Sequence, residues 1–238
     1  NFSNQMIGLY HNEGSGLFVD EAPSSAIGRA SLLTLSFGVF FVDYDLDGQP
    51  DIFTANGHIE EESGRVQPKV QYRQPPLLFH NLGNRKFENV APTMGAEFNR
   101  AVVARGAAYG DIDRDGDLDL LITTNHGPAY LFRNDGGNQN NWICIRTVGS
   151  KSNRDGIGAV VRIESASGRQ WSCVRSGSSY CSQSDLALTF GLGKDPLIKS
   201  VEIDWPSGAK QTLSNIAPNQ FIKVEEGKGI ISQSGPAK

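Results

Sequence analysis

Long apolar runs, long helical patterns and an excess of basic residues are all missing from this chain of 238 residues. No stretch stays apolar over the length that a transmembrane helix needs, so the sequence predicts no membrane span. The first ten residues, NFSNQMIGLY, do not have the pattern of a signal peptide. With 22 basic and 26 acidic residues and a pI near 5.6, the chain has no electrostatic footprint for nucleic acid.

The motifs of common hydrolases are missing as well. His58 and His126 lie in polar turns, and glutamates follow His58 at 60–62, but no H-x-x-x-H spacing accompanies them. The Ser-rich segment 176–185 has no G-x-S-x-G elbow. We therefore expect no enzyme, and a metal-dependent hydrolase is the least favoured alternative.

Aspartate, by contrast, is concentrated in two short segments. The first, FVDYDLDGQPDIF at 41–53, places aspartates at 43, 45, 47 and 51 around Gly48. Carboxylates this close repel one another unless a cation neutralises them or the side chains splay into water. Counted from Asp43, the first half has the oxygen spacing of an EF-hand loop, but Asp51 at position 9 closes the loop early. An all-oxygen set of this kind favours calcium over magnesium.

The segment GDIDRDGDLDLLITTN repeats the spacing D-x-D-x-D-G-x-x-D 68 residues downstream. Both segments lie between residues rich in Val, Ile, Phe and Thr, so each is expected to be a calcium loop that joins two strands. The alternative, a solvated Asp-rich turn, would have to explain the same spacing twice. The predicted ligands are Asp43, Asp45, Asp47, the Gln49 carbonyl and Asp51, and Asp111, Asp113, Asp115, the Asp117 carbonyl and Asp119.

The repeat extends beyond the loops. LYHNEGSGLFVDEAP at 9–23 aligns with LFHNLGNRKFENVAP at 78–92, and LFRNDGGN at 131–138 opens a third copy, which predicts stacked β units. The first copy has no Asp loop before it, so the chain is expected to begin inside a repeat. Exposed apolar residues are expected there, and if the chain is complete as given, we expect them to pair with another copy of the chain into rings or filaments. Upstream repeats or packing on the second domain are the alternatives. The apolar residues expected to be exposed are Leu9, Tyr10, Leu17 and Phe18.

Phe37 and Gly38, ahead of the first Asp segment, resemble the FG-GAP repeat, also called VCBS-like, of integrin-α-type β-propellers. The resemblance implies that residues 1–140 form part of a propeller whose blades carry calcium in these loops. The second copy departs from the pattern, because Arg105 and Gly106 stand where Phe and Gly are expected.

From residue 141 the composition changes and the repeat stops. Short strands separated by Gly, Ser, Asn, Asp and Pro turns predict a compact β-sandwich or barrel over 141–226, followed by a loose tail at 227–238. The motifs SNRDGIGA, SGSSYCSQSD, FGLG and WPSG, in this order, resemble the ASPIC/UnbV domain that follows FG-GAP repeats in bacterial secreted proteins. No defined biochemical activity is implied by that resemblance.

Cysteine is scarce, with three residues in the chain. Cys173 and Cys181 flank the turn VRSGSSY and would lie opposite each other if the flanking strands paired antiparallel about Gly177. This allows a disulfide bond and leaves Cys144 as a small buried apolar residue. The alternative is three free thiols packed as apolar residues, and the sequence leaves both open. An extracellular location favours the bond.

We therefore expect a secreted or cell-surface protein, of bacterial source, that binds calcium and serves adhesion, matrix structure or assembly. Weak calcium loops are usable where calcium is millimolar, which is the basis for the extracellular location. Its partners are expected to be a glycan, a matrix protein or further copies of itself. A carbohydrate-binding module is the main alternative, with four candidate aromatic residues, Tyr72, Trp171, Tyr180 and Trp205.

Overall fold

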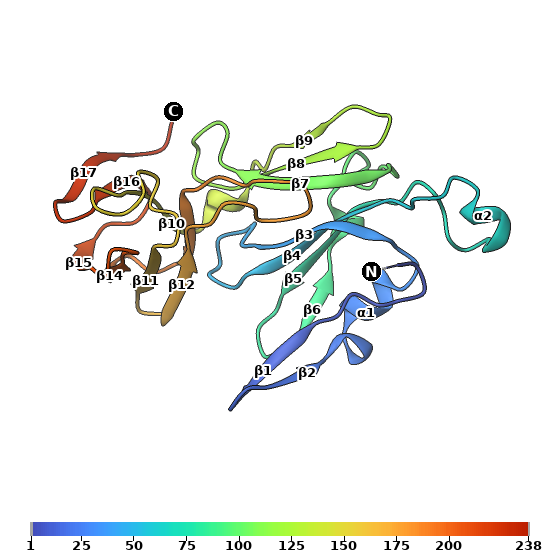
Figure 1. Ribbon diagram of the computed structural model, residues 1–238, viewed down its shortest axis with the longest axis horizontal. Helices are drawn as coiled ribbons and strands as arrows, with labels where there is room; N and C mark the ends of the chain where they lie inside the picture. The colour runs from blue at the N-terminus through green and yellow to red at the C-terminus, as the bar shows by residue number, and fades with distance from the viewer. Residues whose placement is uncertain (1, 238) are drawn as a thin grey trace.

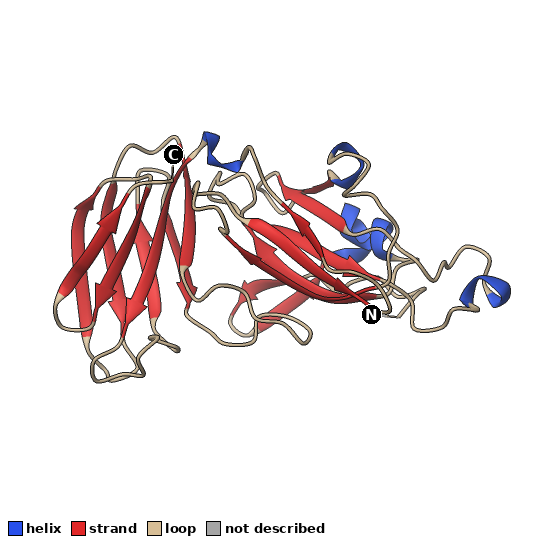
Figure 2. Ribbon diagram, turned by 90° about the horizontal axis from the view of Figure 1, so that it is seen from above, coloured by secondary structure: helices blue, strands red, loops and turns tan. Residues whose placement is uncertain are grey.

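The computed structural model describes residues 2–237 and has an all-β architecture, as the sequence predicts. The strands form five sheets, and within these residues no sheet closes on itself. Figures 1 and 2 show two neighbouring groups of strands, one from the N-terminal part of the chain and one from the C-terminal part. No helix among residues 2–237 is long and apolar enough to cross a membrane.

The N-terminal part repeats one strand order. In a four-stranded and a three-stranded sheet, each strand pairs antiparallel with the next, and an Asp loop joins the first two strands. A two-stranded hairpin and two short helices, α1 (Ala26–Ser31) and α2 (Ser63–Val66), complete this part. The strands are β1 (Tyr10–Gly14) and β2 (Leu17–Asp20) in the hairpin, β3 (Ser36–Val42), β4 (Asp51–Asn56), β5 (Leu77–Asn81) and β6 (Phe87–Asn89) in one sheet, and β7 (Ala104–Gly110), β8 (Asp119–Thr124) and β9 (Tyr130–Phe132) in the other.

Close packing of β3 against β7 joins these two sheets around a shared apolar core. A Cβ atom on Gly38 would lie 2.7 Å from the Cβ of Ala107, so the strands can approach this closely only because residue 38 is glycine. Gly106, at the equivalent place in the second copy, is also crowded, since its Cβ would lie 2.6 Å from the Ser182 hydroxyl. Arg105 compensates for the missing Phe by stacking its guanidinium 4.3 Å from the ring centre of Phe37.

The β1–β2 hairpin carries the exposed apolar residues that the repeat predicts. Tyr10, Leu17 and Phe18 are 68%, 66% and 60% exposed. Leu9 differs from that expectation, because it packs against the cluster that contains Ile27. The exposed surface is therefore narrower than predicted and lies on the hairpin itself.

The C-terminal part is a β-sandwich. Two four-stranded sheets, with the orders β13-β10-β16-β17 and β12-β11-β14-β15, enclose one apolar core to which Ile143, Ile145, Val161 and Ile163 contribute alternate positions. The strands are β10 (Asn141–Val148), β11 (Val160–Glu164), β12 (Arg169–Cys173), β13 (Leu188–Gly193), β14 (Ile198–Asp204), β15 (Lys210–Ile216), β16 (Gln220–Glu225) and β17 (Gly229–Ser234).

Within the described residues, half of the segment expected to be a loose tail is a strand instead. Residues 229–234 form β17 and pair antiparallel with β16. Beyond the strand, the Ala237 amide donates to the carbonyl of Arg114 in the second Asp loop at 2.7 Å. The strand was not predicted, because β17 lies at a sheet edge and its mostly exposed side chains give no alternating apolar pattern.

An arm of the sandwich, residues 175–185, reaches the strands of the N-terminal part. The Ser179 hydroxyl accepts from the Val39 amide at 2.9 Å, and the Ser184 hydroxyl accepts from the Tyr109 amide at 3.2 Å. Tyr180 packs edge-on against Phe37, with ring centres 4.9 Å apart. The arm therefore connects the sandwich to both β3 and β7.

The arm also decides the cysteine question. All three cysteines are free, with Cys144 buried, Cys173 partly buried and Cys181 exposed. The predicted antiparallel pairing about Gly177, which a Cys173–Cys181 disulfide bond requires, is absent from the described residues, because the arm leaves the sheet after β12 to contact β3 and β7. The three thiols are free, as in the alternative, but only Cys144 is packed as a buried apolar residue.

We expect three alkylated cysteines when the purified protein is denatured without reductant and treated with iodoacetamide. Mass spectrometry of the intact chain measures the number of labels. A Cys173–Cys181 bridge would leave a single label, on Cys144, and would contradict the path of the arm.

Glu226 closes one end of the sandwich. Its carboxylate accepts from the amides of Ser150, Lys151 and Ser152 at 2.7 to 2.9 Å and from the hydroxyl of Ser207. Desolvation raises the pKa of Glu226, but the hydrogen bonds from Ser152, Ser207, Lys151 and Ser150 outweigh it and lower the pKa to about 2. The ionised carboxylate therefore holds loop 149–152 in place.

Replacement Glu226→Gln is expected to lower the Tm at pH 7 by several degrees, because an amide NH2 would face three amide donors. Since the folded pKa is lowered, the stabilisation is complete above the unfolded pKa of about 4.3 and is lost as the pH falls toward 2. The Tm difference between variant and wild type should therefore shrink over that range. Glu225→Gln, one residue away, is the matched control. A difference that is constant from pH 7 to pH 2.5 would contradict the role of the charge.

Candidate metal centres

Both Asp loops occupy the same place in their sheets, between the first and second strand. Residues 43–51 join β3 to β4, and residues 111–119 join β7 to β8. The backbones match as well, because Leu46 and Arg114 at loop position 4 have φ near 60°, and the glycines at position 6, Gly48 and Gly116, have φ of 90° and 110°. These left-handed positions allow the tight turn that the spacing predicts.

The hydrogen bonds of the two loops correspond atom by atom. The aspartate at position 1 accepts from the glycine amide, at 2.9 Å for Asp43 and 3.0 Å for Asp111. One oxygen of the aspartate at position 9 accepts from the amide at position 2, at 3.2 Å for Asp51 and 2.9 Å for Asp119. The same network therefore fixes both loops.

Carboxylates converge inside each loop. Asp43, Asp45 and Asp47 bring one oxygen each to within 4.8 Å of one another, and the same holds for the corresponding three aspartates of the second loop, Asp111, Asp113 and Asp115. Asp51 is fully buried, and Asp119 is 1% exposed. The aspartates at position 9 therefore turn inward, whereas those at positions 1, 3 and 5 are partly buried, apart from Asp113, which is exposed.

Several of these oxygens are buried without a hydrogen-bond partner among the described residues. In the first loop they are Oδ1 of Asp43 and Oδ1 of Asp45, and in the second loop they are Oδ1 of Asp111 and Oδ1 of Asp117. Buried carboxylate oxygens without a donor are costly unless a cation faces them. The position 1 oxygen is unpartnered in both loops, which indicates a common ligand position.

The pKa values of the loop aspartates also reflect this crowding of buried carboxylates. Burial, and then the charge of Asp51, raise the pKa of Asp43 to about 8. Burial also raises the pKa of Asp51 and of Asp117 to about 7, and that of Asp111 to about 6. The protein alone therefore disfavours full ionisation of either loop, and a bound cation would remove this penalty.

The donor chemistry fits calcium. All the predicted ligands are oxygens, from carboxylates and, at position 7, from the backbone of Gln49 or Asp117, which is the set that a hard divalent cation prefers. Ligation by these two carbonyls stays a prediction. The Gln49 side chain points back to Asp47, with its Nε2 3.4 Å from Oδ2.

Three supporting residues were not identified from the sequence. Asn81 and Asn134 donate their amides to the second oxygen of Asp51 and Asp119, at 2.7 and 2.9 Å, and thereby complete the buried end of each loop. His80 lies beside the first loop, with Nδ1 3.1 Å from Oδ1 of Asp51. The repeated strings LFHN and LFRN carry the signal for the asparagines, because they recur at the end of the third strand of each unit.

The histidines considered for zinc do not join a cluster. Nδ1 of His58 accepts from the amide of Glu60 at 3.0 Å, which is a local turn contact. Neither His58 nor His126 belongs to any group of converging His, Cys, Asp or Glu atoms among residues 2–237.

The four aromatic candidates for sugar binding have different environments. Trp205 is 3% exposed and belongs to the core of the sandwich, so the prediction that it could stack on a sugar is wrong. Tyr180 packs against Phe37, and the Tyr72 hydroxyl accepts from the Asn125 side chain at 3.4 Å. Trp171 is 70% exposed, more than any of the other three.

Comparison with known proteins supports the assignment of the sandwich. Residues 149–231 match the family model "ASPIC and UnbV". The chain is 28% identical to cartilage acidic protein 1 of Homo sapiens and of Mus musculus over 92% of its length, and 27% identical to the Xenopus tropicalis protein over 87%. It spans about 40% of the length of these relatives. Residues 149–231 are therefore similar to an ASPIC/UnbV domain, and the similarity to cartilage acidic protein 1 extends across both parts of the chain.

Proposed function

We propose that this chain is a calcium-binding structural module of an extracellular protein, in which two calcium ions hold the N-terminal sheets against the ASPIC/UnbV-like sandwich. The observation that carries the proposal is the pair of matching Asp loops, each with the same hydrogen bonds and each with buried carboxylate oxygens that lack a donor. When bound, calcium supplies the positive charge that lets these carboxylates ionise together.

The position of the loops supports a role at the joint between the two parts. The Leu46 carbonyl accepts from the Gly193 amide at 3.0 Å, and the Asp45 carbonyl accepts from the Asn140 side chain at 2.9 Å. In the second loop, Gly116 lies so close to the ring of Trp142 that any Cβ would clash. Ordering the loops would therefore also order the joint.

The N-terminal sheets fit the role of propeller blades of the FG-GAP type. They share strand order, loop position and a common core, and Gly38 allows the first strands of neighbouring sheets to approach closely. In this proposal β3–β6 and β7–β9 are two blades, and the β1–β2 hairpin belongs to a third. Self-association through the exposed hairpin residues stays a prediction, to be judged by light scattering.

An extracellular location is part of the proposal. Carboxylate loops of this kind are usable where calcium is millimolar. The relatives described above are vertebrate proteins with "cartilage" in their name, so a bacterial source has no support. A role in adhesion, matrix structure or assembly is consistent with a rigid module that carries no recognised catalytic motif.

Binding of a glycan is the second candidate function. Trp171 and Phe41, which are 70% and 60% exposed, line a hollow of about 610 Å³ between the first Asp loop and β12. Exposed aromatic rings stack on the apolar faces of sugars, and the polar groups of Asn81, Gln170 and Arg175 line the same hollow. Loss of binding on a glycan array in Trp171→Ala, with Trp171→Phe retaining it, is the expected result.

Calcium at a hundredfold excess over its dissociation constant is expected to stabilise the fold by about 2.7 kcal/mol per site, because it binds only the folded state. For a chain of this length this raises the Tm by about 5–10 °C per site. Scanning calorimetry with calcium and with EDTA measures the shift. Asp43→Asn and Asp111→Asn should each remove about half of it.

Asp135→Asn is the matched control, because Asp135 is exposed and pairs with Arg133 at 2.8 Å outside the loop. Its calcium shift should equal that of the wild type. A wild-type Tm that is the same in calcium and in EDTA would overturn the proposed function.

A further inference from the structure

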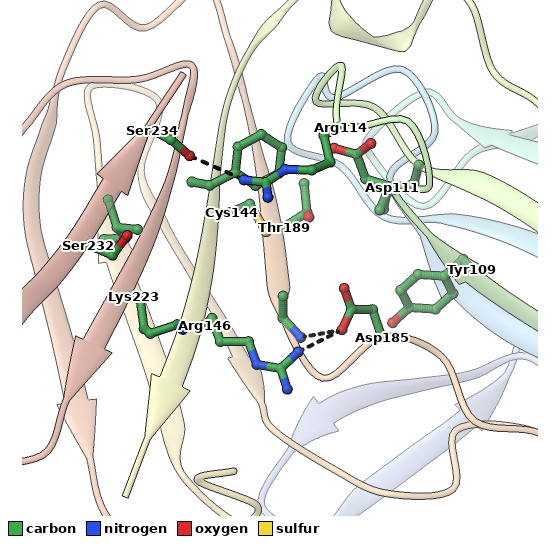
Figure 3. A pocket seen from close by; sticks show the side chains of 14 residues that line it. Tyr109, Asp111, Arg114, Cys144, Arg146, Asp185, Thr189, Lys223, Ser232 and Ser234 are labelled. Carbon is green, nitrogen blue, oxygen red and sulfur yellow. Dashed lines mark hydrogen bonds and ion pairs between the residues drawn. The ribbon is translucent and has the colours of Figure 1, made fainter. Parts of the chain in front are cut away.

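A hollow of about 430 Å³ lies between the sandwich and the second Asp loop (Figure 3). One wall is the outer face of the sheet β13-β10-β16-β17, and the other includes Tyr109, Asp111 and Arg114 of the N-terminal part. The size is that of a pocket for a small molecule.

Two cations stand side by side on the sheet wall. Arg146 of β10 is in direct register with Lys223 of β16, and both side chains point into the hollow (Figure 3). Like charges directly opposite each other on neighbouring strands destabilise a sheet. Arg146 is shared between Asp185 at 3.4 Å and Asp155 at 3.6 Å, whereas Lys223 has no ion pair among residues 2–237. Lys223 is therefore the cation of this pair that has no carboxylate partner among residues 2–237.

Arg114 brings a third cation from the opposite wall. Its guanidinium lies 4.7 Å from the ring centre of Phe221 and donates to the hydroxyl of Ser234 at 3.2 Å. It has no carboxylate partner within the described chain. Stacking on the ring holds its position, and its remaining N–H donors are free to bind a ligand.

Hydroxyl groups line the rest of the hollow. Thr189 and Ser234 flank Cys144 and Phe221 in one row across the sheet, Ser232 lies beside Lys223 in the next row, and Tyr109 faces them. A ligand bound here would meet Arg146 and Lys223 in one row and Arg114, hydroxyls and the ring of Phe221 in the other. The carboxylates of Asp111 and Asp185 also line the hollow.

We propose that this hollow binds a small hydroxylated organic anion, such as an acidic sugar, with its carboxylate or sulfate at Lys223, beside Arg146, and with a second polar group near Arg114. The charge-assisted hydrogen bonds of these cations would recognise the oxyanion. The hydroxyl side chains would recognise the neutral part of the ligand.

The inference rests on the proposed calcium site in the second loop. Asp111 lines the hollow, and four more carboxylates of that loop lie next to it in the sequence. Without calcium their charge opposes an anion. Calcium would offset that charge, and Asp185 would then be the remaining carboxylate of the lining against Arg114, Arg146 and Lys223. Binding of the anion is therefore calcium-dependent.

The test is to titrate the full chain with D-glucuronate in millimolar calcium, with glucose as the neutral control. Calorimetry measures the affinity, and the backbone amide NMR shifts of β10, β16 and β17 locate the binding site. Elemental analysis of the same sample gives its calcium content independently. We expect glucuronate to bind and to shift amides around Lys223, glucose to bind at least tenfold more weakly, and EDTA to abolish glucuronate binding.

Lys223→Gln is expected to lower the affinity roughly tenfold or more, as the loss of one charge-assisted hydrogen bond implies. Lys199→Gln, the same change at an exposed position on β14, should leave the affinity within twofold, and circular dichroism verifies the fold of both variants. Two bound calcium ions without glucuronate binding, or equal binding of glucose, would overturn this inference and leave the calcium proposal intact. A sample without calcium would overturn both.

Discussion

Repulsion between carboxylates that the fold forces together is the constraint on which the rest of this structure depends. Each Asp loop brings three carboxylate oxygens to within 4.8 Å of one another, and it buries a further aspartate at its end. Hydrogen bonds from backbone amides satisfy one oxygen of the first aspartate and leave the other without a donor. In the proposed function, a bound divalent cation would resolve this conflict.

The same loops support the contact between the two parts of the chain. The first meets β13 through Leu46, and the second meets β10 through Gly116 and the C-terminal segment through Arg114. The arm at 175–185 adds a second connection through Ser179 and Ser184. If calcium neutralises the loops as proposed, it also stabilises the joint between the two parts. The hollow beside Lys223 depends on this joint, because its two walls come from different parts of the chain.

Patterns that are local in the sequence allowed the correct predictions. The Asp spacing, with glycine at position 6, specifies a loop whose backbone turns at Gly48 and Gly116, and the turn spacing after residue 141 specifies short strands. The repeat placed the exposed residues on the β1–β2 hairpin. It did not predict that Leu9 turns inward, because that depends on contacts with α1.

Features set by distant contacts could not be predicted. The turn at Gly177 reads as a hairpin, but the segment is an arm whose partners lie 140 residues earlier at Val39. β17 has mostly exposed side chains and gains its order from pairing with β16. Asn81 donates to Asp51 from 30 residues away, although its recurrence as Asn134 was visible in the repeat.

Amide hydrogen exchange with and without calcium tests most directly whether calcium orders the loops and the joint. The account predicts slower exchange in calcium at Gly48 and Gly116 and also across the joint, at Gly193. Exchange that is unchanged by calcium in both loops would contradict it.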